Sequence, residues 1–298
     1  IIFSRDELKQ SEMSLIHNKK NFRYFIGDVR DEKRLNLACR DVDIIIHAAA
    51  MKQVTTSEYN PMECINTNIN GSQNIIDAAI NNNVKKVIAL SSDKAVSPLN
   101  LYGASKLASE KLFIAANNIS GGKCIFSCVR YGNVSGSRGS VIPLFKKIEN
   151  NSSNFFPITD LKMTRFFILL SEGVKFVLDS MKNMKGGEIF IPKLTSFYIK
   201  DLPKALNSKK KIKVTGIRPG EKIDEILFSK DESKYVLEFK KYFIIEPMIA
   251  MTKNKNYLIS LSNEKGKRYK KNEEYSSGKN IFLKPLELRK ILIKDNLI

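Results

Sequence analysis

The chain has 298 residues, of which 43% are hydrophobic and 27% are charged. These proportions are typical of a soluble globular protein, and the length allows a large core and one or two domains. No apolar run reaches the ~18–20 residues that a membrane-spanning helix needs, so we expect no membrane span in this chain.

The formal net charge is +19. Such an excess is consistent either with nucleic-acid binding or with a compositional bias towards Lys and Asn. The lysines are spread along the chain, with small basic clusters at 209–211 and 265–271, and no nucleic-acid-binding motif is recognisable. We therefore favour the compositional bias and expect no nucleic-acid partner.

The cysteines and histidines show no metal-binding spacing. Only four Cys and two His are present, so we predict no metal site. Cys124 and Cys128 lie in one apolar segment, which favours core packing. Free thiols without a signal-peptide pattern predict a cytoplasmic protein.

Short apolar runs alternate with helical patterns in the first half of the chain. After a strand that begins at Ile1, strands are predicted over 23–26, 43–47, 84–90 and 124–130. Helices are predicted between them, over 6–17, 32–39, 61–81 and 102–117. This alternation predicts an α/β fold with a doubly wound parallel sheet covered by helices on both faces.

The pattern loosens after about residue 134. Helices are predicted over 141–148, 171–184 and 221–228, and strands over 188–191 and 212–216, with a further apolar run at 242–245. We expect the back half to form a smaller, mixed α/β domain.

The start of the chain lacks a glycine-rich loop. No Gly-x-Gly-x-x-Gly pattern is present there, and no glycine precedes Gly27. A dinucleotide-binding fold places its first strand and phosphate loop ahead of the strand at Ile1. We therefore expect the chain to be a fragment whose N-terminal strand and Gly-rich loop are missing.

Four side chains that can carry protons follow the predicted strand 84–90. Asp93 and Lys94 come directly after it, and Tyr102 and Lys106 are spaced to share one face of the next helix. An ammonium beside a phenol lowers the pKa of the phenol, so we expect Lys106 to lower the pKa of Tyr102. Ligands of open α/β sheets bind at this end of the strands, which makes the segment a candidate catalytic site.

Six ordered blocks, including 91–106, carry a family resemblance. The other five are residues 4–9, 27–30, 47–52, 131–140 and 216–222. Together they resemble the extended short-chain dehydrogenase/reductase superfamily and, within its polysaccharide-biosynthesis dehydratases, the inverting UDP-N-acetylglucosamine 4,6-dehydratases of pseudaminic acid synthesis. The likeness covers nearly the whole chain.

The resemblance implies a Rossmann-like fold in which two regions of the chain bind different molecules. Residues 1–134 would form an incomplete NADP-binding domain, to which residues 166–200 return. Residues 135–298 would mainly form the substrate-binding domain. The implied partners are a UDP-sugar substrate and further copies of the chain in a homo-oligomer.

In the reaction that the resemblance implies, NADP takes a hydride from C4 of the sugar and leaves a 4-ketone. Lys94 then removes the acidified C5 proton, and Asp93 protonates the departing C6 hydroxyl. The hydride returns to C6, and C5 is reprotonated with inversion, so the net reaction is that of a hydro-lyase. These roles require a lowered pKa for Lys94 and a raised pKa for Asp93.

The resemblance also assigns the remaining catalytic positions. Tyr102 would deprotonate the C4 hydroxyl, and Lys106 would hold the nicotinamide ribose. Ser92 would hydrogen-bond the reacting hydroxyl or the cofactor.

Two further sets of residues follow from the resemblance. Arg5 and Lys9 suit the 2′-phosphate of NADP, so NADP is favoured over NAD. The implied cofactor contacts are Ser4, Arg5, Asp6, Lys9, Asp28, Val29, Ala48, Ala49, Leu90, Ser91, Tyr102, Lys106 and Val134. The implied substrate contacts are Lys52, Asn133, Arg138, Thr159, Arg165, Arg218, Glu221 and Tyr275. For Arg165 and Glu221, a structural ion pair is an alternative role.

Three alternatives to this function stay open. A nucleotide-sugar 4-epimerase of the same superfamily would also use Tyr102 and Lys106, but it would not need Asp93 and Lys94. A C5-retaining 4,6-dehydratase is a closer alternative, which we expect to be a long chain with membrane spans ahead of its catalytic domain. A degenerate scaffold or a basic nucleic-acid-binding module would use none of these residues.

Overall fold

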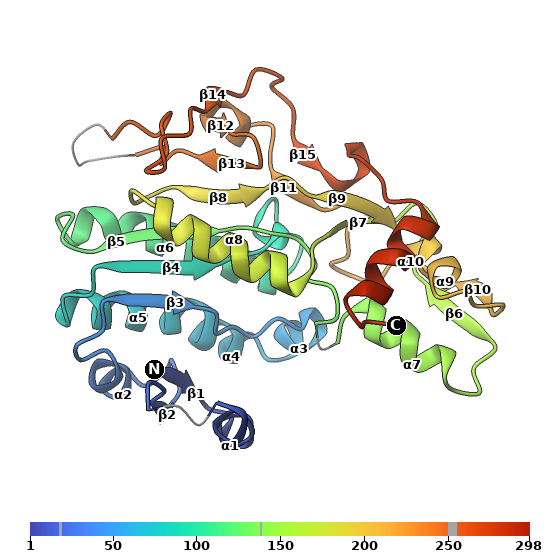
Figure 1. Cartoon of the computed structure of the whole chain (residues 1–298), viewed down its shortest axis with the longest axis horizontal. Helices are drawn as coiled ribbons and strands as arrows, with labels where there is room; N and C mark the ends of the chain where they lie inside the picture. Colours follow the sequence, from blue (N-terminus) through green and yellow to red (C-terminus); the bar gives the residue numbers. More distant parts are fainter. Residues whose placement is uncertain (18–19, 138, 250–254) are drawn as a thin grey trace.

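The main sheet of the protein has seven strands (Figure 1). The structure is a computed structural model and describes residues 1–17, 20–137, 139–249 and 255–298. In sheet order the strands are β14 (Lys267–Arg268), β12 (Val236–Glu238), β13 (Tyr242–Ile245), β8 (Ile189–Pro192), β5 (Ile125–Val129), β4 (Lys86–Leu90) and β3 (Ile44–His47).

Four adjacent strands of this sheet, β3, β4, β5 and β8, run parallel. The apolar residues of β4, β5 and β8 are mostly buried, because helices cover both faces of this part of the sheet. Figure 1 shows α8 (Leu170–Asn183) in front of the sheet and α5 (Gly71–Asn81) and α6 (Leu101–Ile119) behind it. The prediction of an α/β fold with a parallel central sheet is confirmed.

The antiparallel end of the sheet was not predicted. β13 pairs with β8, β12 with β13, and β14 with β12, all antiparallel. These strands come from residues 236–268, which the sequence assigned to the smaller domain. The main sheet is therefore built from both halves of the chain.

Beyond β3 lies a separate parallel pair, β1 (Ile2–Ser4) and β2 (Tyr24–Ile26). The helices α1 (Glu7–Ile16) and α2 (Glu32–Ala38) follow these two strands. Within the described part of the chain, β3 pairs only with β4. Ile44 and Ile46 on β3 are 43% and 46% exposed, so this edge of the main sheet is apolar and open.

The predicted helix over 61–81 contains a π-helical turn. It consists of α4 (Pro61–Ile65), the π turn η1 (Asn66–Asn70) and α5. π turns are rare and often occur at functional sites. The other short helical segments are α3 (Val54–Tyr59) and the 3-10 turns η2 (Asp93–Ala95), η3 (Ile199–Asp201), η4 (Glu232–Tyr235) and η5 (Ser277–Lys279).

A second core lies at the other end of the molecule. Two-stranded pairs form between β6 (Phe155–Ile158) and β10 (Lys211–Val214), and between β7 (Thr164–Phe167) and β9 (Thr195–Tyr198). Apolar side chains of β6, β7 and β9 form one cluster with residues of α7 (Val141–Glu149), α9 (Leu202–Ala205) and α10 (Pro285–Lys294). Figure 1 shows these helices gathered at the right of the molecule.

The prediction of a helix over 221–228 is wrong. Residues 221–225 are irregular, and Ile226–Phe228 form β11, which pairs antiparallel with β15 (Tyr275–Ser276). Leu227 and Phe228 are fully buried in the main core. Pairing and burial thus outweigh the local helical preference of this segment.

The described residues include no helix with the length and apolar character needed to cross a membrane.

Candidate active site

The carboxyl end of β4 leads directly into the proton-carrying residues. Ser92 caps η2, because its hydroxyl accepts from the Lys94 amide (3.3 Å) and donates to Asp93 Oδ1 (2.7 Å). The Asp93 amide donates to the Tyr131 carbonyl at the end of β5 (3.2 Å). Asp93 is thereby fully buried, whereas the Lys94 side chain is 24% exposed.

Lys94 lies between two carboxylates. Its ammonium is 3.0 Å from Asp93 Oδ1 and 3.2 Å from Glu225 Oε1. Arg165 of β7 approaches the same Glu225 oxygen at 3.6 Å. The sequence interpretation missed Glu225, whose only signal is its position three residues after the block 216–222.

The electrostatics of this cluster agree with one expectation and contradict another. Burial raises the pKa of Asp93, although the nearby Lys94 ammonium opposes it. This is the direction that a proton donor needs. Burial lowers the pKa of Lys94, but Asp93 and Glu225 outweigh burial and raise it above its usual value. The lowered pKa expected for Lys94 is therefore wrong for the site without substrate, because two carboxylates stabilise the ammonium.

Tyr102 lies in the first turn of α6, beside η2. Asn100 caps this helix by accepting from the Gly103 amide (2.8 Å), and its own amide donates to the Gly220 carbonyl (2.9 Å). A Cβ on Gly103 would collide with the Lys94 carbonyl oxygen. Only glycine therefore allows η2 to approach α6 this closely.

Lys106 does not lower the pKa of Tyr102 as the sequence suggested. Burial raises the pKa of Tyr102, and the cation that opposes this rise is Lys94. The Lys106 ammonium instead donates to the Leu90 carbonyl at 2.5 Å, and burial lowers the pKa of Lys106. The expectation fails because the end of the Lys106 side chain is hydrogen-bonded to the backbone of β4.

One side chain of the π turn joins the loop after β3 to α6. The Asn68 amide oxygen accepts from the Met51 amide (2.8 Å), and its nitrogen donates to the Met51 carbonyl (3.0 Å) and to Ser105 Oγ (2.8 Å). Its neighbours four residues away also contact α6. Cys64 meets Ser105 (3.6 Å), and Ser72 meets Ser109 (2.8 Å).

Five predicted cofactor residues lie together at the ends of β1 and β2. Ser4 Oγ accepts from the Asp6 amide (3.1 Å), and Lys9 pairs with the Asp6 carboxylate (2.8 Å). Arg5 reaches Asp28 at 3.4 Å, and its side chain is 60% exposed. An exposed guanidinium at this edge suits a phosphate group.

The other predicted cofactor residues follow β2, β3, β4 and β5. Ala48 and Ala49 are exposed, which leaves the backbone after β3 accessible. The buried Ser91 hydroxyl has no hydrogen-bond partner among the described residues. Val29 is buried and packs close to Gly71, and Val134 pairs with Ile168. The open backbone and the unpaired hydroxyl fit the ribose and nicotinamide end of a dinucleotide.

The predicted substrate residues do not all converge. Arg165 joins the cluster through Glu225, and the buried Asn133 Oδ1 has no partner among the described residues. Arg218 pairs with Glu221, so the alternative of an ion pair holds for Glu221. Lys52 is exposed, and Thr159 Oγ1 donates to the Met163 sulfur (3.3 Å). Arg138 lies outside the described residues.

Tyr275 is held in the core by its present partners, and its contact with substrate stays a prediction. Its hydroxyl accepts from the Leu194 amide (2.8 Å) and donates to the Leu194 carbonyl (3.0 Å). Its ring packs against Phe166 and Phe243, with centroids 5.0 and 5.2 Å away. Tyr275 therefore stabilises the core, because its polar group is already satisfied.

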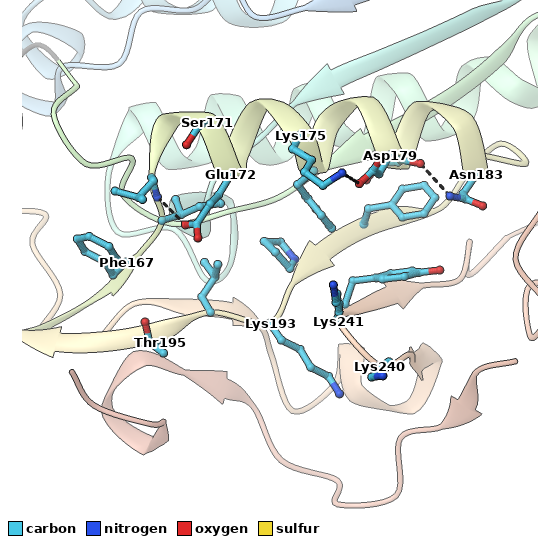
Figure 2. Close-up of a pocket in the computed structure, with 18 of the residues that line it drawn as sticks. Phe167, Ser171, Glu172, Lys175, Asp179, Asn183, Lys193, Thr195, Lys240 and Lys241 are labelled. Carbon is cyan, nitrogen blue, oxygen red and sulfur yellow. Dashed lines mark hydrogen bonds and ion pairs between the residues drawn. The ribbon is translucent and has the colours of Figure 1, made fainter. Parts of the chain in front are cut away.

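A large cleft of about 1480 Å³ lies elsewhere, along α8. Figure 2 shows α8 on one wall and Lys193, Lys240 and Lys241 across from it. Lys175 pairs with Asp179 within it (3.3 Å). No predicted site residue that the structure describes lines this cleft. The cluster at Asp93 is instead the candidate active site, because buried acids, an amine and a tyrosine meet there.

The sequence matches a family profile described as polysaccharide biosynthesis protein over residues 1–247. The chain belongs to this polysaccharide biosynthesis family. Tyr102, Lys106 and the Asp93–Lys94 pair all fall within the matched region. The family resemblance inferred from the six blocks is confirmed.

Two relatives illustrate the range of names among similar proteins. The chain is 57% identical over 282 residues to a UDP-N-acetylglucosamine 4,6-dehydratase (inverting) of Campylobacter jejuni (strain 81-176), covering 94% of this chain and 84% of that protein. It is 42% identical over 299 residues to a UDP-glucose 4-epimerase of Rickettsia akari, covering 98% of this chain and 86% of that protein.

Solved structures agree with the fold of this family member. Pen from Bacillus thuringiensis superposes with a TM-score of 0.88 at 38% identity, covering 99% of this chain and 89% of that chain. DesIV, a dTDP-glucose 4,6-dehydratase from Streptomyces venezuelae solved with NAD and TYD, gives a TM-score of 0.65 at 20% identity, covering 74% and 73%. The likeness to DesIV concerns the fold alone.

Proposed function

We propose that the protein is a UDP-N-acetylglucosamine 4,6-dehydratase that inverts C5, a hydro-lyase of nucleotide-sugar and surface-glycan biosynthesis. The observation that carries this proposal is the ion pair of the buried Asp93 carboxylate with the partly buried Lys94 ammonium, 3.0 Å apart, beside Tyr102. An epimerase would need the tyrosine but no acid–amine pair. The Campylobacter jejuni relative, at 57% identity, supports the same choice.

The cofactor that we propose is NADP. When bound, it accepts a hydride from C4 of the sugar and returns one to C6. Arg5 and Lys9 would hold the 2′-phosphate, and Asp28 and Val29 would flank the adenine. Leu90, Ser91, Val134 and the two alanines after β3 would line the rest, as the open backbone and unpaired hydroxyl there support.

Asp93 and Lys94 need to share only one proton for the elimination. In the resting cluster that proton sits on Lys94, because two carboxylates raise the pKa of Lys94. Moving it to Asp93 Oδ1, which lies 3.0 Å from the Lys94 nitrogen, yields a neutral amine and a protonated acid at once. The amine then takes the C5 proton, and Asp93 gives its proton to the C6 hydroxyl.

Tyr102 and Lys106 act at C4. Tyr102 removes the proton of the C4 hydroxyl, helped by the positive charge of Lys94. Lys106, fixed on the Leu90 carbonyl, holds the ribose end of the cofactor. Ser92 positions the Asp93 carboxyl through its 2.7 Å hydrogen bond.

The remaining proposals concern the surroundings of the enzyme. Lys52, Asn133, Arg165 and Arg218 would bind the sugar and diphosphate of the substrate. The four cysteines are free and buried, which suits a reducing compartment such as the cytoplasm. A homo-oligomer is proposed from the family resemblance.

The test is to incubate the protein with NADP and UDP-N-acetylglucosamine in deuterated water and to follow the product by proton NMR. We expect a new C6 methyl group, deuterium at C5 and the inverted C5 configuration. A retained C5 configuration would identify a retaining dehydratase, and a 4-epimer without a C6 methyl would identify an epimerase. Binding of nucleic acid without turnover would support the non-enzymatic alternative.

The Lys94→Ala variant tests the assignment of the base. We expect it to lower the dehydration rate by about 10²–10⁴-fold, which is the usual contribution of general acid–base catalysis. Lys85→Ala is the matched control, because Lys85 is an exposed lysine that pairs with Asp43 next to the opposite end of β4. Equal dehydration rates for the two variants would show that Lys94 is not the base.

A further inference from the structure

We propose that Glu225 is a positioning residue that holds the amine of Lys94 beside Asp93 and sets the pH range over which this pair keeps its shared proton. The inference rests on the proposed function, since it concerns the elimination step. Glu225 would touch neither substrate nor cofactor and would act through Lys94.

The backbone of Glu225 is fixed from both sides. Its amide donates to Ser277 Oγ (2.9 Å), and its carbonyl accepts from the Ser277 amide (2.8 Å). Ser277 in turn is held by Thr164 of β7, with the two hydroxyls 2.6 Å apart. Two segments remote in sequence therefore clamp the residue immediately before β11.

The side chain of Glu225 points at the catalytic pair from a buried position. It is only 3% exposed, and its Oε1 lies 3.2 Å from the Lys94 ammonium. Its second oxygen, Oε2, has no hydrogen-bond partner among the described residues. Burying a carboxylate is costly unless a nearby charge compensates it, so Lys94 and Glu225 depend on each other.

The charged and titratable groups that face Lys94 come from four elements. Asp93 comes from η2, Tyr102 from α6, Arg165 from β7, and Glu225 with Lys222 from the segment before β11. Lys222 is itself anchored to the Val96 carbonyl (2.6 Å). Without Glu225, one carboxylate would face Lys94 against two cations.

Glu225 and Arg165 have opposite effects on the pKa of Lys94. Burial lowers the pKa of Lys94, Asp93 and Glu225 raise it, and Arg165 lowers it. Glu225 also raises the pKa of the Asp93 carboxyl. Removing Glu225 should therefore lower both apparent pKa values of the Asp93–Lys94 pair, and removing Arg165 should raise the pKa of Lys94.

The first experiment measures the pH profile of kcat for three variants. Glu225→Gln should move the alkaline limb to lower pH by about 1–3 units, the usual effect of one opposite charge at this distance. Arg165→Gln should move the same limb to higher pH. Glu238→Gln is the matched control, since Glu238 is also paired with a lysine, Lys193 at 2.8 Å, but on β12. It should not move the limb.

The second experiment separates this inference from the proposed function. Nitrogen-15 NMR of the Lys94 side chain, assigned from its loss in Lys94→Arg, reports the titration of the amine without turnover. Glu225→Gln should lower the Lys94 pKa by the same 1–3 units even if the protein acts on another sugar.

Two results would overturn the inference. One is an unchanged Lys94 titration in a folded Glu225→Gln protein. The other result concerns Glu225→Asp, which keeps the charge and is used if Glu225→Gln does not fold. We expect Glu225→Asp to retain the wild-type pH profile. A loss of activity that is equal at every pH would instead show a merely structural role.

Discussion

His47 is a residue whose burial gives the protein a specific sensitivity to acid. It ends β3, is 4% exposed, and packs against Phe113 with centroids 5.6 Å apart. Burial, with a smaller effect of the Lys106 charge, lowers the pKa of His47 to about 3. The folded protein therefore binds a proton at His47 much less readily than the unfolded chain does.

We expect stability to fall below the unfolded-state pKa of ~6.5. The contribution of His47 is complete above that pH and is lost as the pH falls towards 3, at about 1.4 kcal/mol per unit, or ~2 kcal/mol at pH 5. Between pH 7 and pH 5, the free energy of unfolding measured with urea should fall by about 2 kcal/mol less in His47→Gln than in the wild type.

The control for this prediction is His17→Gln, which changes the only other histidine, an exposed one. It should leave the pH dependence of the unfolding free energy unchanged. If both variants behaved alike, the acid sensitivity would have to come from the buried carboxylates instead.

Individual site residues were partly predictable from sequence. Asp93, Lys94, Tyr102 and Lys106 follow one strand, so their proximity came from order along the chain. Glu225 was not predictable, because it reaches Lys94 only through the pairing of β11 with β15. The expected pKa direction of Lys94 was wrong partly for the same reason, since Glu225 adds to the effect of Asp93. The expected direction for Tyr102 was wrong because burial raises its pKa.

At the scale of elements, the contact between η2 and α6 depends on the glycine after Tyr102. Gly103→Ala would force the Lys94 backbone away from α6, because the added Cβ collides with the Lys94 carbonyl oxygen. A displacement of about 1 Å can cost a catalytic site about 10²-fold in rate. We expect at least such a loss in kcat, measured by product formation.

Gly173→Ala is the matched control for this substitution. Gly173 lies in α8, and its Cβ would meet only Ile168 Cδ1 at an ordinary 3.8 Å. Replacing a helical glycine by alanine where there is room stabilises by up to about 1 kcal/mol. Unchanged kcat in Gly103→Ala would mean that η2 does not need this close approach.

The predictability of elements followed their length and burial. Strands β4 and β5 and helix α6 were predicted because each has a continuous apolar or periodic pattern. β12 and β14, of three and two residues, are too short to give such a pattern. The helix expected at 221–228 failed because its residues find partners 50 positions away, at Ser277 and β15.

At the scale of the whole molecule, Arg130 joins α6, the helix of Tyr102, to both halves of the chain. It is 1% exposed at the end of β5 and donates twice to Glu110 of α6, at 2.9 and 2.6 Å. It also donates to the Leu227 carbonyl of β11 (2.9 Å) and pairs with Glu232 (3.1 Å). One guanidinium thus holds four elements.

We expect Arg130→Met to lower the free energy of unfolding by about 3–5 kcal/mol, because Glu110 is left buried without its partner. Arg268→Gln is the control, since Arg268 makes an exposed pair with Glu246 and should cost at most about 1 kcal/mol. Urea unfolding measures both. Similar losses would show that the buried pair adds nothing beyond an exposed one.

The parallel α/β part of the fold was recognisable from sequence because the family blocks are loops at strand ends, where chemistry restricts the residue types. The arrangement of the second core was not, since its short strands pair across long sequence distances. The surroundings of Tyr275 were not predictable for a similar reason, because its aromatic neighbours Phe166 and Phe243 are distant in sequence.

The π turn makes the length of one helical segment matter as much as its composition. In a regular α-helix, positions spaced four apart drift by about 80° over eight residues. Cys64, Asn68 and Ser72 have this spacing, yet all three meet α6 because the wider turn removes the drift. A substitution at any one of them removes a single side-chain contact with α6, whereas a one-residue deletion would rotate the segment and release the loop at Met51 from α6.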